Sequence, residues 1–358
     1  MMRRALLRCG ARGWPERVRR YTRAAVCEDF DAPLAVRAWP LRDELAPDEV
    51  RVRCCAAGLN FAEALQLRGE YQEKLQPPFV PGNELSGVVE AVGARVTTVA
   101  VGDAVVALPR GGAWATDAVV HESACFPLRG LTAADVDFAA AAALACNYGT
   151  ASMALGRRAG VQAGETVVIT AAAGGVGLAA VDLAVARDCR VVACCGDDSK
   201  LAVAAARGAA AGVNYEKCRK ADGSFDSKLF RAALGEAAPH GVDAAIDMVG
   251  NVLTEALVRL LNFEGRLVVV GFAGGAIPKI AMNLLLVKNC ALKGVYWGAY
   301  AAKKPQIFIE CMTEVVDMFV SGAVKPAVGV KLPLDAVNDA VRVLTGRAST
   351  GKVVLVMS

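Results

Sequence analysis

The chain has 358 residues, which is long for one ordinary domain and suits two. Hydrophobic residues make up 55% of it and charged residues 21%, a balance that allows large buried cores and excludes wholesale disorder. With only two histidines, His121 and His240, a histidine-rich metal site is excluded, and the longest uncharged run, residues 138–156, is too rich in alanine for a good membrane-spanning helix.

Most of the positive charge lies in the first 22 residues. They hold seven arginines and a single acid, Glu16, with apolar residues such as Leu6 and Trp14 between them. This pattern predicts a mitochondrial transit peptide and a matrix location, although it is poor in serine, and an irregular N-terminus is the alternative. Without this segment 33 basic and 35 acidic residues remain, which argues against a globally basic nucleic-acid binder.

Residues 23–146 are predicted to be rich in β-structure. Their short apolar or alternating runs, each bounded by turn residues, are Val50–Cys54, Ser86–Ala91 and Ala104–Ala107. The tail, residues 323–358, returns to a strand-like run at Val353–Val356. We expect it to fold back onto this first domain.

From residue 147 onward, buried-strand runs alternate with helical patterns. The runs are Val167–Thr170, Val176–Arg187, Arg190–Cys195, Ser199–Arg207, Ala244–Met248, Leu253–Leu261 and Leu267–Val270. Such alternation predicts an α/β fold with a doubly wound parallel sheet, the Rossmann arrangement. The expected parts are a leader, residues 1–22, a dinucleotide-binding domain, residues 147–290, and a β-rich domain made of residues 23–146 and 291–358.

The turn from Ala171 to Gly177 is the main functional signal. It follows a β-branched strand and opens an amphipathic helix, which is the context that a dinucleotide-binding fingerprint requires. Gly174 would let the backbone approach a pyrophosphate, Gly177 would let helix and strand pack, and the helix N-terminus supplies unpaired N–H groups. Ala171 fills the first glycine slot, and a merely structural turn is the alternative. The predicted cofactor-binding residues here are Ala173, Gly174, Gly175, Val176 and Gly177.

The end of the second strand bears on which nicotinamide cofactor binds. Asp197 lies about 20 residues after the glycines, where a carboxylate would hold the ribose 2′-hydroxyl of NAD. The strand is predicted to end at Cys195, however, which makes Asp197 late for that role. Lys200 lies where it could pair with the 2′-phosphate of NADP, or it could be a solvated lysine at a helix N-terminus. These residues alone leave the preference open.

Ordered motifs along residues 23–358 resemble a known family. They are Gly58–Phe61, Arg68–Tyr71, Pro81–Gly87, Gly102-Asp103, Ala171–Gly177, Asn214-Tyr215, Gly271–Gly275 and Ser349–Val353. The family is that of the zinc-free quinone oxidoreductases, the zeta-crystallin branch of the medium-chain dehydrogenase/reductases. The resemblance implies that the β-rich domain is GroES-like and catalytic and that it wraps around a Rossmann domain.

The resemblance also bears on metal. In zinc-dependent relatives a cysteine and a histidine ligate the catalytic ion, and those positions here hold Asn60 and Asn83. A carboxamide is a poor zinc ligand beside thiolate and imidazole, and the run of four closely spaced cysteines that a structural zinc lobe needs is absent from the sequence. We therefore expect no metal.

For the cofactor, the resemblance implies NADPH held by the glycine turn, Lys200 and Tyr215, with Gly271 and Phe272 on the loop beside the nicotinamide. Asp197 stands where such relatives often have serine or threonine, and its charge would repel a 2′-phosphate. NADH therefore stays possible.

Without a metal, the cofactor must carry most of the chemistry. The expected reaction is hydride transfer to a quinone or an α,β-unsaturated carbonyl, with much of the rate coming from positioning. By resemblance, Asn60 and Thr150 lie by the nicotinamide and exchange hydrogen bonds with cofactor or substrate, and Tyr71 could protonate an enolate. The alternatives are a turn residue for Asn60, a helix cap for Thr150 and packing under a loop for Tyr71. Tyr296-Trp297 with Tyr300 could wall the substrate pocket or belong to the core.

Two other functions are alternatives. Gly82–Glu84, Trp114 and Asn147 resemble positions in mitochondrial enoyl-thioester reductases, where Tyr71 would be the proton donor. The second alternative is a catalytically weak protein of the crystallin type that binds NADPH or RNA. The nearly neutral charge of the chain after residue 22 argues against RNA as the main partner. A homodimer, paired through the last Rossmann strand near Ala291–Tyr296, is expected by resemblance.

Overall fold

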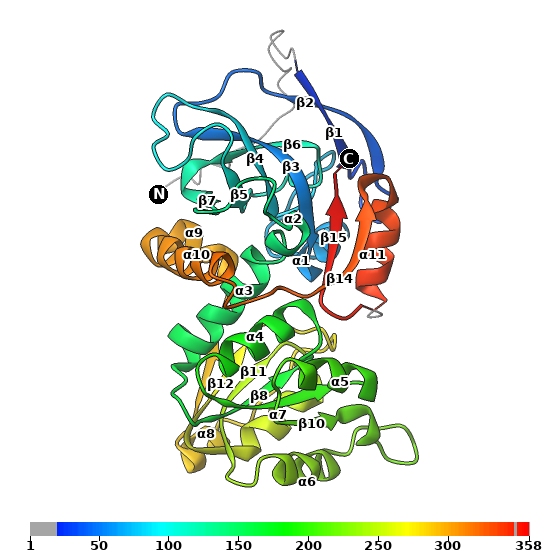
Figure 1. Ribbon diagram of the computed structural model, residues 1–358. Helices are drawn as coiled ribbons and strands as arrows, with labels where there is room; N and C mark the ends of the chain where they lie inside the picture. The colour runs from blue at the N-terminus through cyan, green and yellow to red at the C-terminus, as the bar shows by residue number, and fades with distance from the viewer. Residues whose placement is uncertain (1–19, 347–348, 358) are drawn as a thin grey trace, which may run out of the picture.

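The computed structural model describes residues 20–346 and 349–357, which form two domains, one above the other in Figure 1. The upper, β-rich domain is built from both ends of the chain, and the lower domain, from its middle, carries a parallel sheet. The predicted transit peptide lies outside the described residues except for its last three. Among the residues described, no helix is long and apolar enough to cross a membrane.

Strand β1 (Arg20–Val26) corrects the predicted end of the leader. It pairs antiparallel with β2 (Ala35–Leu41), and Arg20 forms ion pairs with Glu90 at 2.6 Å and Asp117 at 3.2 Å. These contacts make residues 20–22 part of the β-rich domain. The β-rich domain therefore begins at Arg20, three residues before the predicted start at residue 23. The cleavage point of a leader stays a prediction.

The main sheet of the β-rich domain brings the two chain ends together. Its order is β14-β15-β3-β4-β5-β7, with β6 also paired to β3. The strands are β3 (Glu49–Leu59), β4 (Leu85–Val92), β5 (Ala104–Ala107), β6 (Asp117–His121), β7 (Cys125–Pro127), β14 (Val328–Pro333) and β15 (Lys352–Val356). The helices nearby are α1 (Phe61–Gln66), α2 (Phe138–Ala141) and α11 (Val337–Thr345). Since β15 pairs antiparallel with β3, the prediction that the tail folds back is confirmed.

The parallel sheet confirms the predicted Rossmann arrangement. Its order is β10-β9-β8-β11-β12-β13, with every pairing parallel. The strands are β8 (Thr166–Thr170), β9 (Arg190–Cys195), β10 (Ala211–Asn214), β11 (Val242–Asp247), β12 (Leu261–Val269) and β13 (Ala291–Gly294). The helices are α4 (Gly175–Val185), α5 (Asp198–Ala206), α6 (Ser227–Ala237), α7 (Asn251–Leu260) and α8 (Asn283–Lys288). Because β13 pairs with β12, the predicted domain boundary at residue 290 falls too early: the parallel sheet continues to Gly294.

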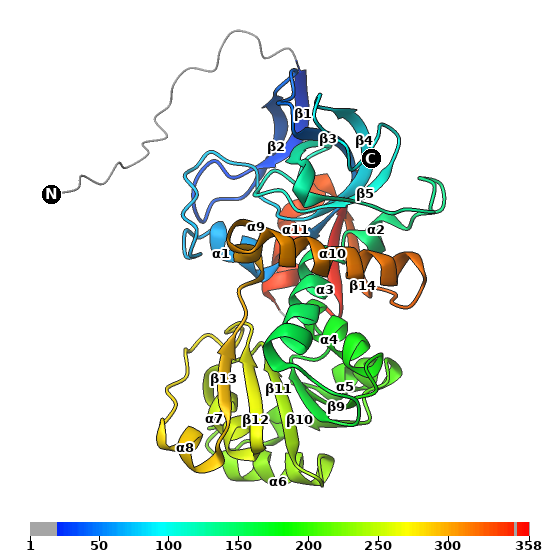
Figure 2. The same cartoon turned by 90° about the vertical axis from the view of Figure 1, so that its left-hand side faces the viewer.

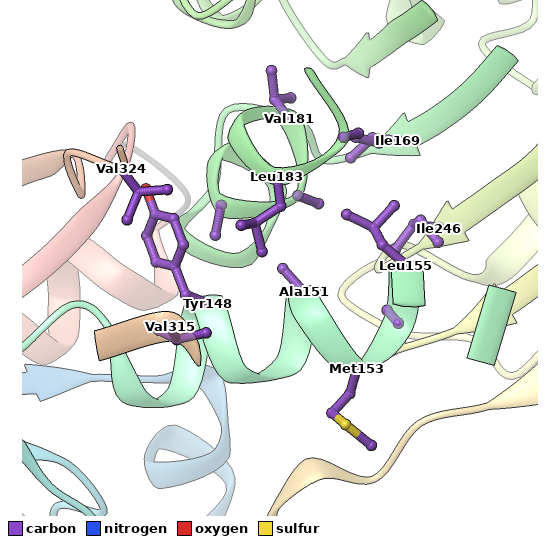
Figure 3. Close-up of a cluster of buried hydrophobic side chains, with 14 of the residues drawn as sticks. Tyr148, Ala151, Met153, Leu155, Ile169, Val181, Leu183, Ile246, Val315 and Val324 are labelled. Carbon is purple, nitrogen blue, oxygen red and sulfur yellow. The ribbon is translucent and has the colours of Figure 1, made fainter. Parts of the chain in front are cut away.

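Helices α3 (Ala145–Ser152), α9 (Tyr300–Lys303) and α10 (Pro305–Val320) lie at the junction of the two domains (Figure 2). The ring of Tyr148 on α3 packs among Val315 and Val324, in the same apolar cluster as Ile169 of β8 (Figure 3). Trp297 also belongs to this core, because its indole nitrogen donates to the Ala145 carbonyl at 3.1 Å inside the protein. The suggestion that Trp297 walls a substrate pocket is therefore wrong.

Candidate cofactor site and active site

The glycine turn joins β8 to α4 as predicted. An added Cβ at Gly177 would lie 2.2 Å from the Ala171 carbonyl oxygen, so only glycine allows helix and strand to pack this closely. At Gly174 the only neighbour of an added Cβ is that same oxygen, at 3.3 Å, which leaves the backbone approachable. The first N–H groups of α4 have no acceptor within the helix and can bind an anion. Of the predicted residues, Gly174, Gly175 and Val176 are thus partly exposed at the helix N-terminus, and Ala173 and Gly177 are buried.

Ala171 takes a left-handed backbone conformation, with φ of 47°, which favours glycine. This explains why the family pattern has glycine in this slot. The turn is also held from outside the Rossmann domain, since the Gly351 N–H donates to the Ala173 carbonyl at 2.8 Å. Asn147 of α3 lies against Gly175, whose added Cβ would be 2.5 Å from the Asn147 Nδ2 atom. Both domains therefore meet at the turn.

Asp197, Lys200 and Tyr215 lie together after the ends of β9 and β10. Asp197 caps α5: its Oδ1 accepts the Lys200 N–H at 2.8 Å, and the Lys200 ammonium is 3.4 Å from Oδ2. Hydrogen bonds from Ser199 and from the Lys200 N–H hold the pKa of Asp197 below its usual value. The Tyr215 ring lies over Gly196, with its hydroxyl 3.3 Å from where a Cβ would stand. Lys200 and Tyr215, the two side chains predicted to hold the cofactor beyond the glycine turn, are thus brought together. Asp197 is engaged as the cap of α5.

Gly271 and Phe272 follow β12, and this loop is joined to the backbone of Asp247, a buried acid that was not singled out from the sequence. Asp247 accepts hydrogen bonds from Thr170 Oγ1 at 2.8 Å, Thr254 Oγ1 at 2.7 Å and the Gly250 N–H at 3.0 Å. The Asp247 carbonyl accepts from Val270 at 2.8 Å, and Phe272 packs on Gly250. Asp247 could have been noticed in the sequence, because it is an acid at the end of the largely apolar strand β11.

Asn60 lies between β3 and α1 in a buried network that includes a buried ion pair. Lys352 is 2% exposed and Glu84 0%, and the two form an ion pair. The Lys352 ammonium also donates to Asn60 Oδ1 at 2.5 Å and to Asn147 Oδ1 at 3.4 Å. Asn60 Nδ2 donates to Glu84 Oε1 at 2.8 Å. Of these residues, the sequence reading proposed a catalytic role only for Asn60.

Glu63 closes the other side of this network. It is fully buried and accepts the Asn60 N–H at 2.8 Å, the Asn83 N–H at 3.0 Å and Asn83 Nδ2 at 2.7 Å. Burial raises the pKa of Glu63, although the nearby Lys352 opposes the rise and Glu84 adds to it. The Cys146 N–H donates to Glu84 Oε2 at 2.7 Å, and burial raises the pKa of the Cys146 thiol well above its usual value.

These residues do not fit a zinc ion. The amides of Asn60 and Asn83 are engaged with carboxylates, and the cation beside Glu84 is the ammonium of Lys352. Zinc prefers thiolate, imidazole and carboxylate ligands, and a bound lysine ammonium would repel it. Over residues 20–346 and 349–357, no group of three histidine, cysteine, aspartate or glutamate side chains is arranged to hold a metal.

Thr150 and Tyr71 come from two separate parts of the chain. Thr150 is inside α3, three residues after Asn147, so the helix-cap alternative is wrong. Tyr71 lies in the loop after α1, close to Tyr296, whose hydroxyl donates to Glu73 Oε1 at 3.2 Å. Burial raises the pKa of Tyr71, so this hydroxyl keeps its proton at neutral pH. The proton-donor role of Tyr71 stays a prediction.

Comparison with known proteins decides the family. Two family models match: Alcohol dehydrogenase GroES-like domain over residues 46–132, and Zinc-binding dehydrogenase over residues 175–317. Quinone oxidoreductase-like protein 2 of Rattus norvegicus is 40% identical over 337 residues, which cover 94% of this chain and 92% of the rat protein. The chain belongs to the quinone oxidoreductase branch of the medium-chain dehydrogenase/reductases.

Solved structures agree with this assignment. The quinone oxidoreductase of Thermus thermophilus, also solved in complex with NADPH, has a TM-score of 0.76 and 32% identity, covering 93% of this chain and 99% of its own. A probable oxidoreductase from Mycobacterium abscessus has a TM-score of 0.81 and 29% identity, covering 94% and 99%. The predicted combination of GroES-like and Rossmann domains is confirmed, and this member of the branch is an NAD(P)H-dependent oxidoreductase.

Proposed function

We propose that the protein is a metal-independent reductase that transfers hydride from NADPH to a quinone or another conjugated carbonyl acceptor. The observation that carries this proposal is the buried Lys352–Glu84 ion pair beside Asn60. By resemblance, Asn60 stands at the position of a metal ligand in zinc-dependent relatives. A site already occupied by an ammonium and two engaged carboxamides suits chemistry that the cofactor supplies. The names of the relatives support a quinone as acceptor.

NADPH, when bound, supplies the hydride. The chain would hold its pyrophosphate on the N–H groups at Gly175 to Gly177 and its 2′-phosphate between Lys200 and Tyr215. The helix-capping role of Asp197 favours this arrangement, because its carboxylate is drawn toward the start of α5. Phe272, which is 38% exposed, would cover one face of the nicotinamide.

The remaining side chains would position the acceptor. The resemblance puts Asn60 and Thr150 beside the nicotinamide, and Tyr71 keeps a proton that a reduced acceptor could take. A quinone spreads the incoming charge over its ring and needs little help from such a donor. An enoyl thioester needs more, so the half-buried, protonated Tyr71 keeps enoyl-thioester reduction as the second candidate.

One titration and one pair of assays test these assignments. NADPH and NADH are titrated side by side by fluorescence, and turnover is then followed with an ortho-quinone and with crotonyl-CoA. We expect NADPH to bind more tightly, and Tyr71→Phe to leave quinone turnover nearly unchanged. Preference for NADH would mean that Asp197 sets the cofactor. Crotonyl-CoA turnover lost in Tyr71→Phe would favour the second candidate, and binding of neither cofactor would remove the enzyme proposal.

We also propose a homodimer joined at β13. This strand ends the parallel sheet and so offers unpaired backbone groups. Apolar side chains between β12 and β13 are exposed: Ile277 73%, Met282 71%, Leu286 81% and Val287 71%. Sedimentation should show a dimer that Leu286→Glu dissociates, and a monomer at micromolar concentration would contradict this.

A mitochondrial location is a further proposal, supported by the arginine-rich residues before β1. If these residues direct import, the mature N-terminus should lie at or before Arg20, because β1 begins there. Cell fractionation of the full chain and of a chain starting at Arg20 tests this. An identical distribution of the two would contradict it.

A further inference from the structure

Lys352 extends from the start of β15 into a region closed to solvent, where its ammonium has three oxygen partners. These are Glu84 Oε1, Asn60 Oδ1 at 2.5 Å and Asn147 Oδ1 at 3.4 Å. An ammonium has three hydrogens to donate and accepts none. The donor capacity of Lys352 is therefore used in full within the protein.

These partners fix the orientation of the Asn60 side-chain amide. Because an ammonium only donates, Asn60 Oδ1 must face Lys352, and because carboxylates only accept, Nδ2 must face Glu84 at 2.8 Å and Glu63 at 3.5 Å. Both N–H groups are thereby directed at carboxylates. One lone pair on Oδ1 remains, so Asn60 can accept a hydrogen bond from a ligand, whereas the nearest acceptors of its N–H groups are Glu84 and, at 3.5 Å, Glu63.

We infer that Lys352 is a positioning residue that holds Asn60 as a hydrogen-bond acceptor for a donor on the nicotinamide half of the cofactor, such as a ribose hydroxyl or the carboxamide N–H. This inference rests on the proposed function and narrows it: Asn60 does not polarise the carbonyl of the acceptor. Lys352 is tied to the cofactor turn, because its neighbour Gly351 donates to the Ala173 carbonyl at 2.8 Å.

A purely structural role for Lys352 is the competing account, and a double variant separates the two. Lys352→Met alone leaves Glu84 buried without its cation, which is strongly destabilising and threatens folding. Lys352→Met with Glu84→Gln removes both charges at similar volume. If Lys352 only balances Glu84, this double variant behaves like the wild type. If Lys352 orients Asn60, the variant folds but binds the nicotinamide half of the cofactor poorly.

The experiment compares NADPH with adenosine 2′,5′-bisphosphate, which lacks the nicotinamide half, as ligands of the full chain. In the double variant we expect NADPH to bind on the order of tenfold more weakly, the loss of one hydrogen bond, and the bisphosphate to bind as in the wild type. Both affinities unchanged, or both weakened equally, would overturn the inference. A wild type that binds neither ligand would instead remove the proposed function.

A mutant cycle adds a readout that a structural role would not move. In an Asn60→Ala background, the double change should have no further effect on NADPH affinity, because its target is gone. A second tenfold loss there would overturn the inference.

Gly58→Ala serves as an independent perturbation. Its Cβ would lie 2.5 Å from Glu84 Oε1 and 2.6 Å from Lys352 Cε, so it displaces the ion pair without removing a polar group. It should weaken NADPH binding and spare the bisphosphate, whereas unchanged NADPH binding in a folded Gly58→Ala protein would overturn the inference.

Discussion

The two halves of the site differ in what they are made of. The cofactor turn is built from backbone: small residues from Ala171 to Gly177 leave N–H groups approachable at the start of α4. The Asn60 network is built from buried charged and amide side chains, with Lys352 and Glu84 withdrawn from water. A backbone site tolerates no added volume, whereas a buried charged site tolerates no lost partner. Substitutions should therefore damage the two halves in different ways.

The largest effect is expected at the ion pair. Lys352→Met should lower the free energy of unfolding by about 3–5 kcal/mol, because Glu84 stays buried without a cation. Adding Glu84→Gln should recover most of this loss. Urea unfolding of the two variants measures it. Equal losses in the single and double variants would mean that packing, and not charge, explains the effect.

At the turn, Gly177→Ala should cost about 1–3 kcal/mol, because the new methyl group meets the Ala171 carbonyl oxygen at 2.2 Å. NADPH binding should weaken as the turn is displaced. Gly235→Ala on α6 is the matched control: an added Cβ meets nothing within 4 Å there, and alanine should stabilise the helix by about 1 kcal/mol. A Gly177→Ala protein as stable as the control would contradict the close packing.

The cofactor turn could be predicted from the sequence, and the Asn60 network largely could not. The turn lies within one short segment, so a strand, small residues and a helix in succession were enough to locate it. The Asn60 network joins residues from the ends of β3 and β4, from α3 and from β15, and these elements are far apart in the chain. Lys352 before an apolar strand and Glu84 after an asparagine look like ordinary surface charges until the fold buries them.

The fold was predicted with errors at its edges for similar reasons. The alternation of apolar strands and helices indicated the parallel sheet, and its last strand was expected near Ala291–Tyr296, but the domain boundary was set at residue 290, before this strand. The start of β1 was assigned to the leader because β1 contains arginines, like the arginine-rich segment before it. The structure shows that Arg20 pairs with acids far away in the sequence.

A small gain in stability is expected at Ala171. Glycine there would relieve the left-handed strain at φ of 47°, and part of the gain would be offset by the greater freedom of the unfolded chain. We expect Ala171→Gly to raise the free energy of unfolding by up to about 1 kcal/mol with NADPH affinity retained. Ala172→Gly, a neighbouring position without positive φ, should instead destabilise the fold. Destabilisation by both changes would contradict strain at Ala171.

The smallest effect concerns pH. Because the pKa of Glu63 is raised in the folded protein, its stabilising contribution is present below the unfolded pKa and is lost as pH rises through the folded pKa. The stability advantage of wild type over Glu63→Gln should therefore shrink as the pH rises from the ordinary pKa of a glutamate through the raised pKa of the folded protein. Urea unfolding across this range measures it. An advantage that grows with pH would mean that the hydrogen bonds from Asn60 and Asn83 outweigh burial.

Metal content measured together with turnover tests the central claim most directly. The full chain is dialysed against a strong chelator, its zinc is determined by mass spectrometry, and NADPH oxidation by an ortho-quinone is followed before and after. We predict only trace zinc and unchanged turnover, because Lys352 supplies the positive charge of the site. Zinc bound at one ion per chain, with turnover lost on its removal and regained on its return, would contradict the account.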